Sequence, residues 1–390
     1  MTAVSPTLEL TAKSVDALTP SDIARWDELR NALPQGISPL FSPRFALAVG
    51  RVRKDVRILM AHRGDRMEAC LAIHARPFGF ARPLGAPFDD VAGPLVAPDS
   101  TLTAETLIAE ADLGIYKAQN AILPEGEAAA DAGSAYVIDV RGEQGEAYLE
   151  ARRKSYPKRF KNFRRLKNKL EREHGDVVFE WGRPNAADLD QLLRWKREQF
   201  LRDGLLDITS ATHSRAILNE IASITPEDPT EFGGFMTVLR CRGELIAGHF
   251  GVREGGHFHP WVSAYRPEFA DCAPGMVLLK WIIRSMGDMG LETYHLASGH
   301  GHYKKYFATP SAAVAPLTAI APGMRGTLHR VRHGVSNALA GSCETSPGAR
   351  LIRRMDHIAV CEPRPVARTR EFAYALMRRS HSSATGGATA

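Results

Sequence analysis

The sequence predicts a mixed α/β protein with two related α/β units, central mixed sheets flanked by helices, and an arginine-rich extension. Short helical and strand patterns alternate over the first 140 residues. After a basic segment, residues 177–298 show the order strand, two helices, three strands, helix, strand. With 44% hydrophobic and 24% charged residues, the composition is that of an ordinary globular protein. We expect units at residues 1–148 and 149–320 and an extension at 321–390.

The first unit begins with clear helix and strand signals. Residues 21–33 predict a helix capped by Ser21, with apolar residues at helical spacing. Residues 56–63 and 68–78 predict two strands around a Gly64-Asp65 turn. A loop rich in glycine and proline follows at residues 85–99, which we expect to connect the sheet to the next helix.

Cysteine content and apolar runs indicate the cellular setting. The five cysteines are scattered and never form C-x-x-C, which argues against a disulfide framework and a thiolate zinc site. The N-terminus has no signal-like apolar core, and no run approaches the roughly 18 apolar residues of a membrane span. We expect a cytoplasmic protein, with peripheral attachment to the inner membrane left open. The net charge of +6 allows an anionic partner without requiring one.

Residues 146–174 predict one long basic helix that opens the second unit. Phe160, Phe163, Leu166 and Leu170 form one apolar stripe, and the other faces carry eleven lysines and arginines. Two interpretations are open. The helix can be a solvated linker packed by its stripe, or a basic face for the phosphates of a nucleotide, a lipid headgroup or RNA.

A helix predicted at residues 273–290 follows the three strands and opens on a Pro-Gly pair. Pro274 suits the first turn of a helix, and Gly275 lets the backbone approach a ligand closely. The free N–H groups and the dipole of a helix N-terminus favour an anion. Ala273, Pro274, Gly275 and Met276 are therefore candidate phosphate-binding residues.

Four segments resemble the CelD/BcsL-type family of GNAT (N-acetyltransferase) proteins, which is associated with bacterial exopolysaccharide synthesis. They are "RRLKNKLEREHGDVVFE", "GELIAGHFG", "YRPEFADCAPGMVLLKWI" and "GHGHYKKYF". In the first unit, "SPLFSPRFALAV" and "DDVAGPLVAP" are similar to the family's N-terminal segments. The family is similar in turn to the tandem-GNAT Fem-type aminoacyl transferases. The resemblance covers about residues 20–310 and excludes the extension.

The resemblance implies tandem GNAT-like domains and acetyl-CoA, or another acyl-CoA, as co-substrate, with no metal. Its pyrophosphate would bind at the start of the 273–290 helix. The acyl group would pass directly to an amine in a cleft where the strands at 257–265 and 291–298 splay apart. Residues 257, 259, 261, 263 and 265 are expected on one strand face by their period of two.

The same resemblance gives roles to individual residues. The backbone near Ser263 and Tyr265 would polarise the acyl carbonyl, and Tyr303 would protonate the leaving thiolate. Lys304 would pair with a phosphate or a substrate carboxylate. His295 stands where the family commonly has an acidic residue, so His259 or His295 would accept the amine proton.

Structural alternatives stay open for these residues. The histidines can be core or strand-surface residues, Tyr265 can be core, and Tyr303 with Lys304 can simply begin a helix. A metal site at His300 and His302 is not favoured, because they are two residues apart with no carboxylate beside them.

Three functions follow for the whole chain. The leading one is transfer of an acetyl or other acyl group from acyl-CoA to an amine. The expected acceptor is an amino sugar of exopolysaccharide or adhesin synthesis, which can be free or linked to a lipid. The alternatives are aminoacyl transfer from charged tRNA, as in Fem-type proteins, and a non-catalytic, nucleotide-responsive effector of polysaccharide production. Nucleic acid is not favoured, because the basic residues at 152–172 are not interleaved with exposed aromatics.

The extension uses arginine as its only strong base between residues 321 and 379. Arg364 and Arg368, like Arg350 and Arg354, have an R-x-x-x-R spacing. The spacing fits neighbours on a solvated helix, or a site for a cyclic dinucleotide or an anionic membrane surface. The composition of residues 382–390 predicts a disordered tail.

Overall fold

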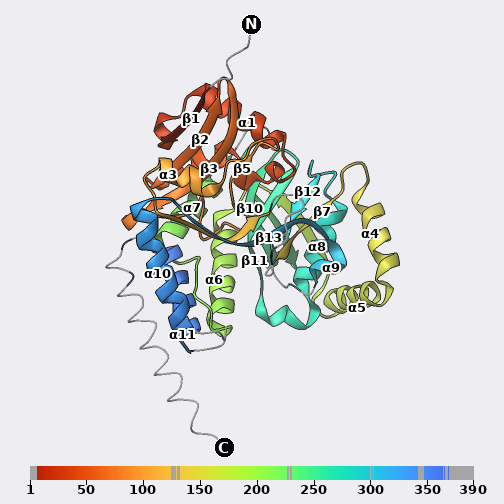
Figure 1. The fold of residues 1–390 in the computed structure, drawn as a ribbon. Coiled ribbons are helices and arrows are strands. Elements are labelled where there is room, and N and C mark those ends of the chain that lie inside the picture. Colours follow the sequence, from red (N-terminus) through yellow and green to blue (C-terminus); the bar gives the residue numbers. More distant parts are fainter. Residues whose placement is uncertain are drawn as a thin grey trace, which may run out of the picture.

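A computed structural model shows one large mixed sheet with helices on both faces (Figure 1). It describes residues 7–123, 129, 132–225, 228, 231–298, 301, 303–340, 347–362, 364 and 368. The strand order is β1-β2-β3-β4-β6-β13-β7-β12-β11-β10-β9-β8, with β5 beside β3. The predicted mixed α/β class is confirmed. Gly299, His300, His302 and the tail at 382–390 lie outside the described residues.

The first part of the chain builds one half of this sheet with its helices. Its elements are β1 (Leu8–Lys13), α1 (Pro20–Asn31), α2 (Pro43–Val52), β2 (Val56–Arg63), β3 (Arg66–Arg76), β4 (Phe80–Pro83), β5 (Leu95–Val96), α3 (Ala104–Glu110), β6 (Ile115–Ile122) and β7 (Gly133–Asp139), with short 3-10 helices η1 (Val15–Ala17), η2 (Pro34–Ile37), η3 (Pro39–Phe41) and η4 (Pro77–Gly79). The expected cap at Ser21 is wrong by two residues. Thr19 caps α1 and forms a reciprocal capping box with Asp22, because Pro20 already occupies the first helical position.

The second part builds the other half and the extension. Its elements are α4 (Gly145–Ser155), α5 (Pro157–His174), β8 (Val177–Gly182), α6 (Ala186–Arg202), α7 (Thr212–Ser223), β9 (Gly233–Cys241), β10 (Glu244–Glu254), β11 (His257–Tyr265), η5 (Pro267–Cys272), α8 (Pro274–Arg284), β12 (Thr293–His295), α9 (Lys304–Phe307), β13 (Thr309–Ile320), α10 (Met324–Ala340) and α11 (Pro347–Cys361). No helix among the described residues is long and apolar enough to cross a membrane.

The single long helix expected at 146–174 is two helices. Pro157 lacks an N–H and disfavours the helical conformation in the residue before it. Tyr156 accordingly has φ −133° and ψ 56°, and α4 ends there before α5 begins. The predicted apolar stripe is otherwise present, since Phe160, Phe163 and Leu170 are buried.

Strand β13 joins the two parts of the chain. It lies between β6 and β7 and pairs antiparallel with both, as in Leu317↔Ala118 and Thr309↔Val137. Strand β7 pairs in turn with β12 on its other side. Strands from both ends of the chain therefore alternate in the middle of one sheet. A domain boundary near residue 148 stays a prediction.

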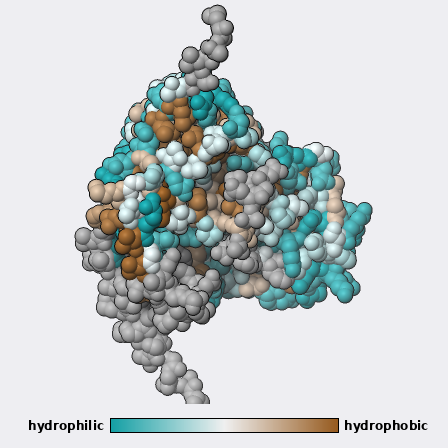
Figure 2. All heavy atoms as spheres, viewed as in Figure 1, coloured by the Kyte–Doolittle hydropathy of each residue, from teal (hydrophilic) through white to brown (hydrophobic). Residues whose placement is uncertain are grey.

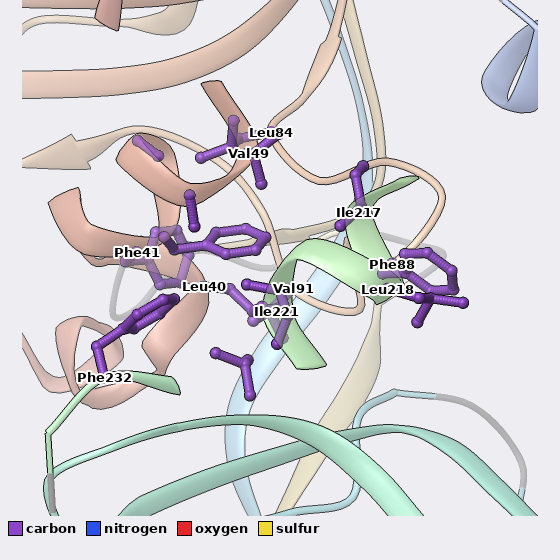
Figure 3. Packing of buried hydrophobic residues seen from close by; sticks show 14 of the residues in the cluster. Leu40, Phe41, Val49, Leu84, Phe88, Val91, Ile217, Leu218, Ile221 and Phe232 are labelled. Atoms are coloured by element: carbon purple, nitrogen blue, oxygen red, sulfur yellow. The ribbon is translucent and has the colours of Figure 1, made fainter. Parts of the chain in front are cut away.

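The largest apolar core also spans both parts. It brings α2 and the loop after β4 against α7, with Leu84 beside Val49, Val91 beside Ile221 and Phe88 beside Leu218 (Figure 3). A second core lies between α4, α5, α8 and the opposite face of the C-terminal strands. A third packs α3 against β2, β3 and β6. The loop at residues 84–91 is thus fixed by apolar side chains rather than left on the surface.

Candidate active site

Two neighbouring parallel strands separate in the middle of the sheet. β11 and β12 pair only at His257↔Thr293 and Phe258↔Tyr294. β11 then continues to Tyr265, whereas β12 ends at His295. The predicted splay between these two strands is confirmed. It leaves a strand edge of β11 that has no β12 partner beyond Phe258.

A β-bulge at Trp261 divides β11 into two stretches with opposite faces. Val262 pairs with Phe250 and Pro260 with Gly251, so Trp261 is the extra residue. Phe258 packs into the core under α8, whereas Val262, an even number of residues later, packs into the core on the α6 side.

The expectation that residues 257 to 265 keep one face by period two is therefore wrong. His257 and His259 face the α6 side, and Ser263 and Tyr265 face α8. The bulge shifts the alternation by one residue. Histidine side chains and the Ser263–Tyr265 stretch consequently approach the splay from opposite sides of the sheet.

The backbone after the bulge points donors at the splay. The Arg266 N–H donates to the Ile246 carbonyl on β10 (2.8 Å). Because N–H groups alternate between the two edges of a strand, those of Ser263 and Tyr265 point to the other edge. That edge is the one from which β12 has diverged, so two backbone donors face the opening.

The N-terminus of α8 lies beside this stretch and carries no side-chain cap. Ala273 is left-handed (φ 49°, ψ 55°), and Pro274 begins the helix. A Cβ added at Gly275 would meet only Cδ1 of Tyr265, at 3.9 Å. Neither crowding nor backbone conformation requires glycine there, so the open space at Gly275 is available to a ligand. With Met276 these residues form the helix start that the sequence predicts as an anion site.

On the opposite side of the splay, His259 is fully buried between two parts of the chain. Its Nε2 lies 3.1 Å from Oδ2 of Asp90, and its Nδ1 lies 3.4 Å from Oγ of Ser38. Both ring nitrogens are therefore occupied. The Asp90 side chain remains 35% exposed, so its carboxylate is the accessible end of this chain of contacts.

His295 stacks on His259 with 5.3 Å between ring centroids and 13° between planes. The parallel register that pairs Phe258 with Tyr294 places these two histidines side by side. Nε2 of His295 lies 3.3 Å from Oγ1 of Thr293. Burial, with His259 and His257 nearby, holds the pKa of His295 well below its usual range, so the ring is neutral near pH 7.

Two lysines lie near Asp90. Nζ of Lys196, on α6, lies 3.5 Å from the Ser263 carbonyl. Lys304 donates to the carbonyls of Ala297 (3.3 Å) and Ser298 (2.5 Å), so in this structure its ammonium contacts the loop after β12 rather than the start of α8. Burial lowers the pKa of both lysines, and the Asp90 carboxylate acts in the opposite direction on each.

Tyr303 is the residue immediately before α9, so its predicted place at a helix start is confirmed. Burial raises its pKa, which keeps the phenol protonated. Cys272 is fully buried, and burial raises the pKa of its thiol. Ligand atoms of Glu173, His174 and Cys272 lie within 4.8 Å of one another beside α8.

Sequence reasoning missed Asp90, Ser38 and Lys196. Asp90 belongs to the Gly/Pro-rich loop that also contributes Phe88, whose ring stacks on Trp261 (5.2 Å, 23°). The adjacent pair Asp89-Asp90 inside an otherwise apolar loop was the available signal. Nothing in a single sequence aligns that loop with β11, 169 residues away.

The basic segment lines a groove of about 480 Å³ between α4, α5 and α8. Arg153, Arg284 and Lys167 each have a glutamate partner, as in Arg284–Glu146 at 2.5 Å. Burial, followed by neighbouring cations, lowers the pKa of Lys280 in the same groove. The apolar stripe packs inward, as the first interpretation expects. Binding of phosphates by the outer basic faces stays a prediction.

Comparisons with known proteins agree on the fold. Residues 157–305 match the family model described as acetyltransferase (GNAT) domain. The crystal structure of FemX covers 83% of this chain and 99% of its own, with a TM-score of 0.53 and 10% identity.

Two further structures were found. One is a tandem GNAT protein from the clavulanic acid biosynthesis pathway (TM-score 0.47, 13% identity, 82% of this chain and 100% of the other). The other is L-PGS from Bacillus licheniformis (TM-score 0.39, 13% identity, 79% and 96%). No curated protein matches the sequence. The chain therefore has a GNAT acyltransferase fold, with the GNAT domain match in the part that carries the splayed strands.

Proposed function

We propose that this protein is an acyl-CoA-dependent N-acyltransferase whose acceptor is an amine. The observation that carries the proposal is the opening between β11 and β12 beside the uncapped start of α8. A thioester with a phosphate-bearing carrier fits this arrangement, since the helix start favours an anion and the strand edge offers backbone donors. The GNAT domain match over residues 157–305 supports the same reading.

The donor would lie on the α8 side of the sheet. Its pyrophosphate would contact residues 273–276, where Gly275 leaves space. The acyl carbonyl would accept hydrogen bonds from the N–H groups of Ser263 and Tyr265. Lys304 has a supporting role in this proposal, because its contacts order the loop after β12.

The amine would approach from the other side, where Asp90 is exposed. An ammonium group pairs with this carboxylate, and transfer of one proton from nitrogen to Asp90 yields the nucleophile. His259 and Ser38 position Asp90, and neutral His295 packs against His259. In this proposal Asp90 has the role of the acidic residue that the CelD/BcsL-type family commonly has at the position of His295.

The transfer itself forms a C–N bond and breaks the C–S bond. Nitrogen attacks the thioester carbonyl, the oxygen gains charge that the backbone donors stabilise, and the thiolate leaves. Protonated Tyr303 can supply the proton that converts this thiolate to free CoA. The nitrogen of the adduct gives up its second proton, which restores the Tyr303 phenol through solvent, and the proton on Asp90 returns to solvent. Acyl-CoA and an ammonium group therefore give an amide, CoA and one proton.

For the acceptor we favour an amino sugar, as the CelD/BcsL resemblance implies. Nε1 of Trp261 is a buried donor with no hydrogen-bond partner in the described part of the chain. A sugar hydroxyl would satisfy it, and the half-buried Trp261 ring suits the apolar face of a sugar. The acceptor can be free or lipid-linked.

Aminoacyl transfer from charged tRNA is the second candidate. The segment 145–174 carries eleven lysines and arginines against four glutamates, a net charge of +7, whereas the whole chain carries +6. The likeness to FemX concerns the fold alone at 10% identity. This concentration of charge is the specific observation in favour of an RNA partner.

Calorimetric titration with acetyl-CoA tests the donor site. Gly275→Glu should abolish binding, because it places a carboxylate where the phosphates would lie. Gly287→Glu is the matched control, since it introduces the same charge just after α8 at a position with nothing within 4 Å. Equal affinity in the two variants would exclude this site. Two activity assays then decide between the two functions. Release of free CoA in the presence of glucosamine or another amino sugar supports the acyltransferase, and transfer of the amino acid from charged tRNA supports the alternative.

A further inference from the structure

The outer face of α10 is apolar, and no part of the chain that the structure describes covers it. Met324, Leu328, Val331 and Val335 are 89%, 71%, 62% and 55% exposed. At about 100° per residue these four positions lie within an arc of about 60°. Figure 2 shows brown side chains along the edge of the molecule where α10 lies. An apolar stripe of this kind normally faces a core.

The opposite face of α10 is the one that holds the helix to the protein. His329 is 5% exposed, and its Nε2 lies 2.9 Å from the Phe78 carbonyl. Gly326 is buried and His333 half-buried on the same side. α10 is therefore inverted relative to an ordinary surface helix, with histidines inward and aliphatic side chains outward. Because its inner contacts already fix the helix, the outer stripe is available to a partner.

One arginine borders the stripe, and a second lies nearer the inner face on the other side. Arg332 lies about 70° from its centre and Arg330 about 130° away in the other direction. Arg330 donates to the Ala321 carbonyl and to Thr327, with no carboxylate among its partners in the described residues. No aspartate or glutamate occurs between residues 321 and 343. Arg325 at the helix start is paired with Asp112 at 2.6 Å.

We propose that α10 docks the protein on an anionic lipid surface. The aliphatic stripe would enter the boundary between headgroups and acyl chains, and the arginines would extend to the lipid phosphates. A second copy of the chain fits less well, because packing two such stripes together brings like-charged arginines close without an acid between them. The inference is independent of the acyl-transfer chemistry.

Co-sedimentation of the full chain with vesicles tests this surface. Binding is expected to vesicles of phosphatidylcholine with phosphatidylglycerol and to be weak on phosphatidylcholine alone. Leu328→Glu should weaken binding at least about tenfold, since the carboxylate opposes both insertion and the surface charge. Val178→Glu, at a 54% exposed valine on β8, is the matched control and should bind as wild type.

Charge reversals separate α10 from the other basic surface. The double variant Arg330→Glu, Arg332→Glu should lose the preference for anionic vesicles. The affinity for these vesicles should fall about fivefold for each unit of charge changed. The double variant Lys158→Glu, Lys161→Glu makes the same change at exposed positions of α5. Its affinity for anionic vesicles should stay within a few fold of the wild-type value. Circular dichroism confirms that each variant is folded.

Three outcomes overturn the proposal. The first is wild-type protein that ignores anionic vesicles. The second is loss of binding in the α5 pair but not in the α10 pair, which would move the contact to the basic segment. The third is a lipid-free dimer, seen by sedimentation velocity, that Leu328→Glu converts to monomer, since that stripe would then be an interface between copies.

Discussion

Replacing Asp90 by asparagine tests the chemistry assigned to the opening between β11 and β12. The amide has the shape of the carboxylate and can still accept the hydrogen bond across the 3.1 Å separation from Nε2 of His259. It cannot take a proton from an amine at neutral pH. Loss of a positioned base costs about 10²- to 10⁴-fold in rate, or about 3–5 kcal/mol of barrier.

The same change should affect stability little. The Asp90 side chain is 35% exposed, so solvent screens its attraction to the neighbouring Lys196 and Lys304. A partly exposed ion pair contributes at most about 1 kcal/mol. The expected signature is therefore a large fall in kcat with a small fall in the free energy of unfolding, and with unchanged affinity for acetyl-CoA on the other side of the sheet.

Asp89→Asn is the control, because the two acids are adjacent but face different surroundings. Burial raises the pKa of Asp89 to about 6, with Arg82 and Asp90 among its charged neighbours. Thiol release from acetyl-CoA is followed with an acceptor that supports turnover, across pH 6 to 9. A rate for Asp90→Asn equal to that of Asp89→Asn would refute the assignment of Asp90 as the proton acceptor.

Further variants test neighbouring residues. Tyr303→Phe should lower turnover about tenfold or more with little change in CoA affinity, because the protonated phenol acts only on the leaving sulfur; equal rates would make Tyr303 structural. His295→Ala should leave the pH–rate profile in place, since the ring is already neutral; a lost limb near neutral pH would make it the base instead. Burial lowers the pKa of His249 from 6.5 to about 3, so the unfolded state binds more protons in that range. Stability should fall with acid by about 1.4 kcal/mol per pH unit from this group, and denaturant melts of His249→Gln should show the slope reduced by one proton.

The order of elements around the opening was predictable because it depends on local patterns. Alternating strands at 233–265, a Pro-Gly helix start and an apolar helix are all visible in consecutive residues. The break between α4 and α5 is also a local feature, because Pro157 starts a new helix rather than continuing the one before it.

Other features depend on pairing between distant segments. The bulge at Trp261 follows from the register between β10 and β11, which no local alternation of side chains reveals. The approach of Asp90 to His259 depends on a core shared by both parts of the chain, where Phe88 stacks on Trp261. The apolar stripe of α10 is visible in the sequence as a periodic pattern. Whether it faces the core or the solvent depends on the tertiary contact of His329 with Phe78 on the other side of the helix.

The central position of β13 bears on how the chain is made. β6 and β7 leave the ribosome long before β13, which lies between them and starts at Thr309. Until then each has an edge of unpaired backbone groups, the kind of edge that recruits other strands. Completing the sheet requires contacts across about 200 residues of sequence, which slows folding. Nascent chains stalled before residue 309 should therefore depend on chaperones more than the finished protein does, although the strands they contain are already complete.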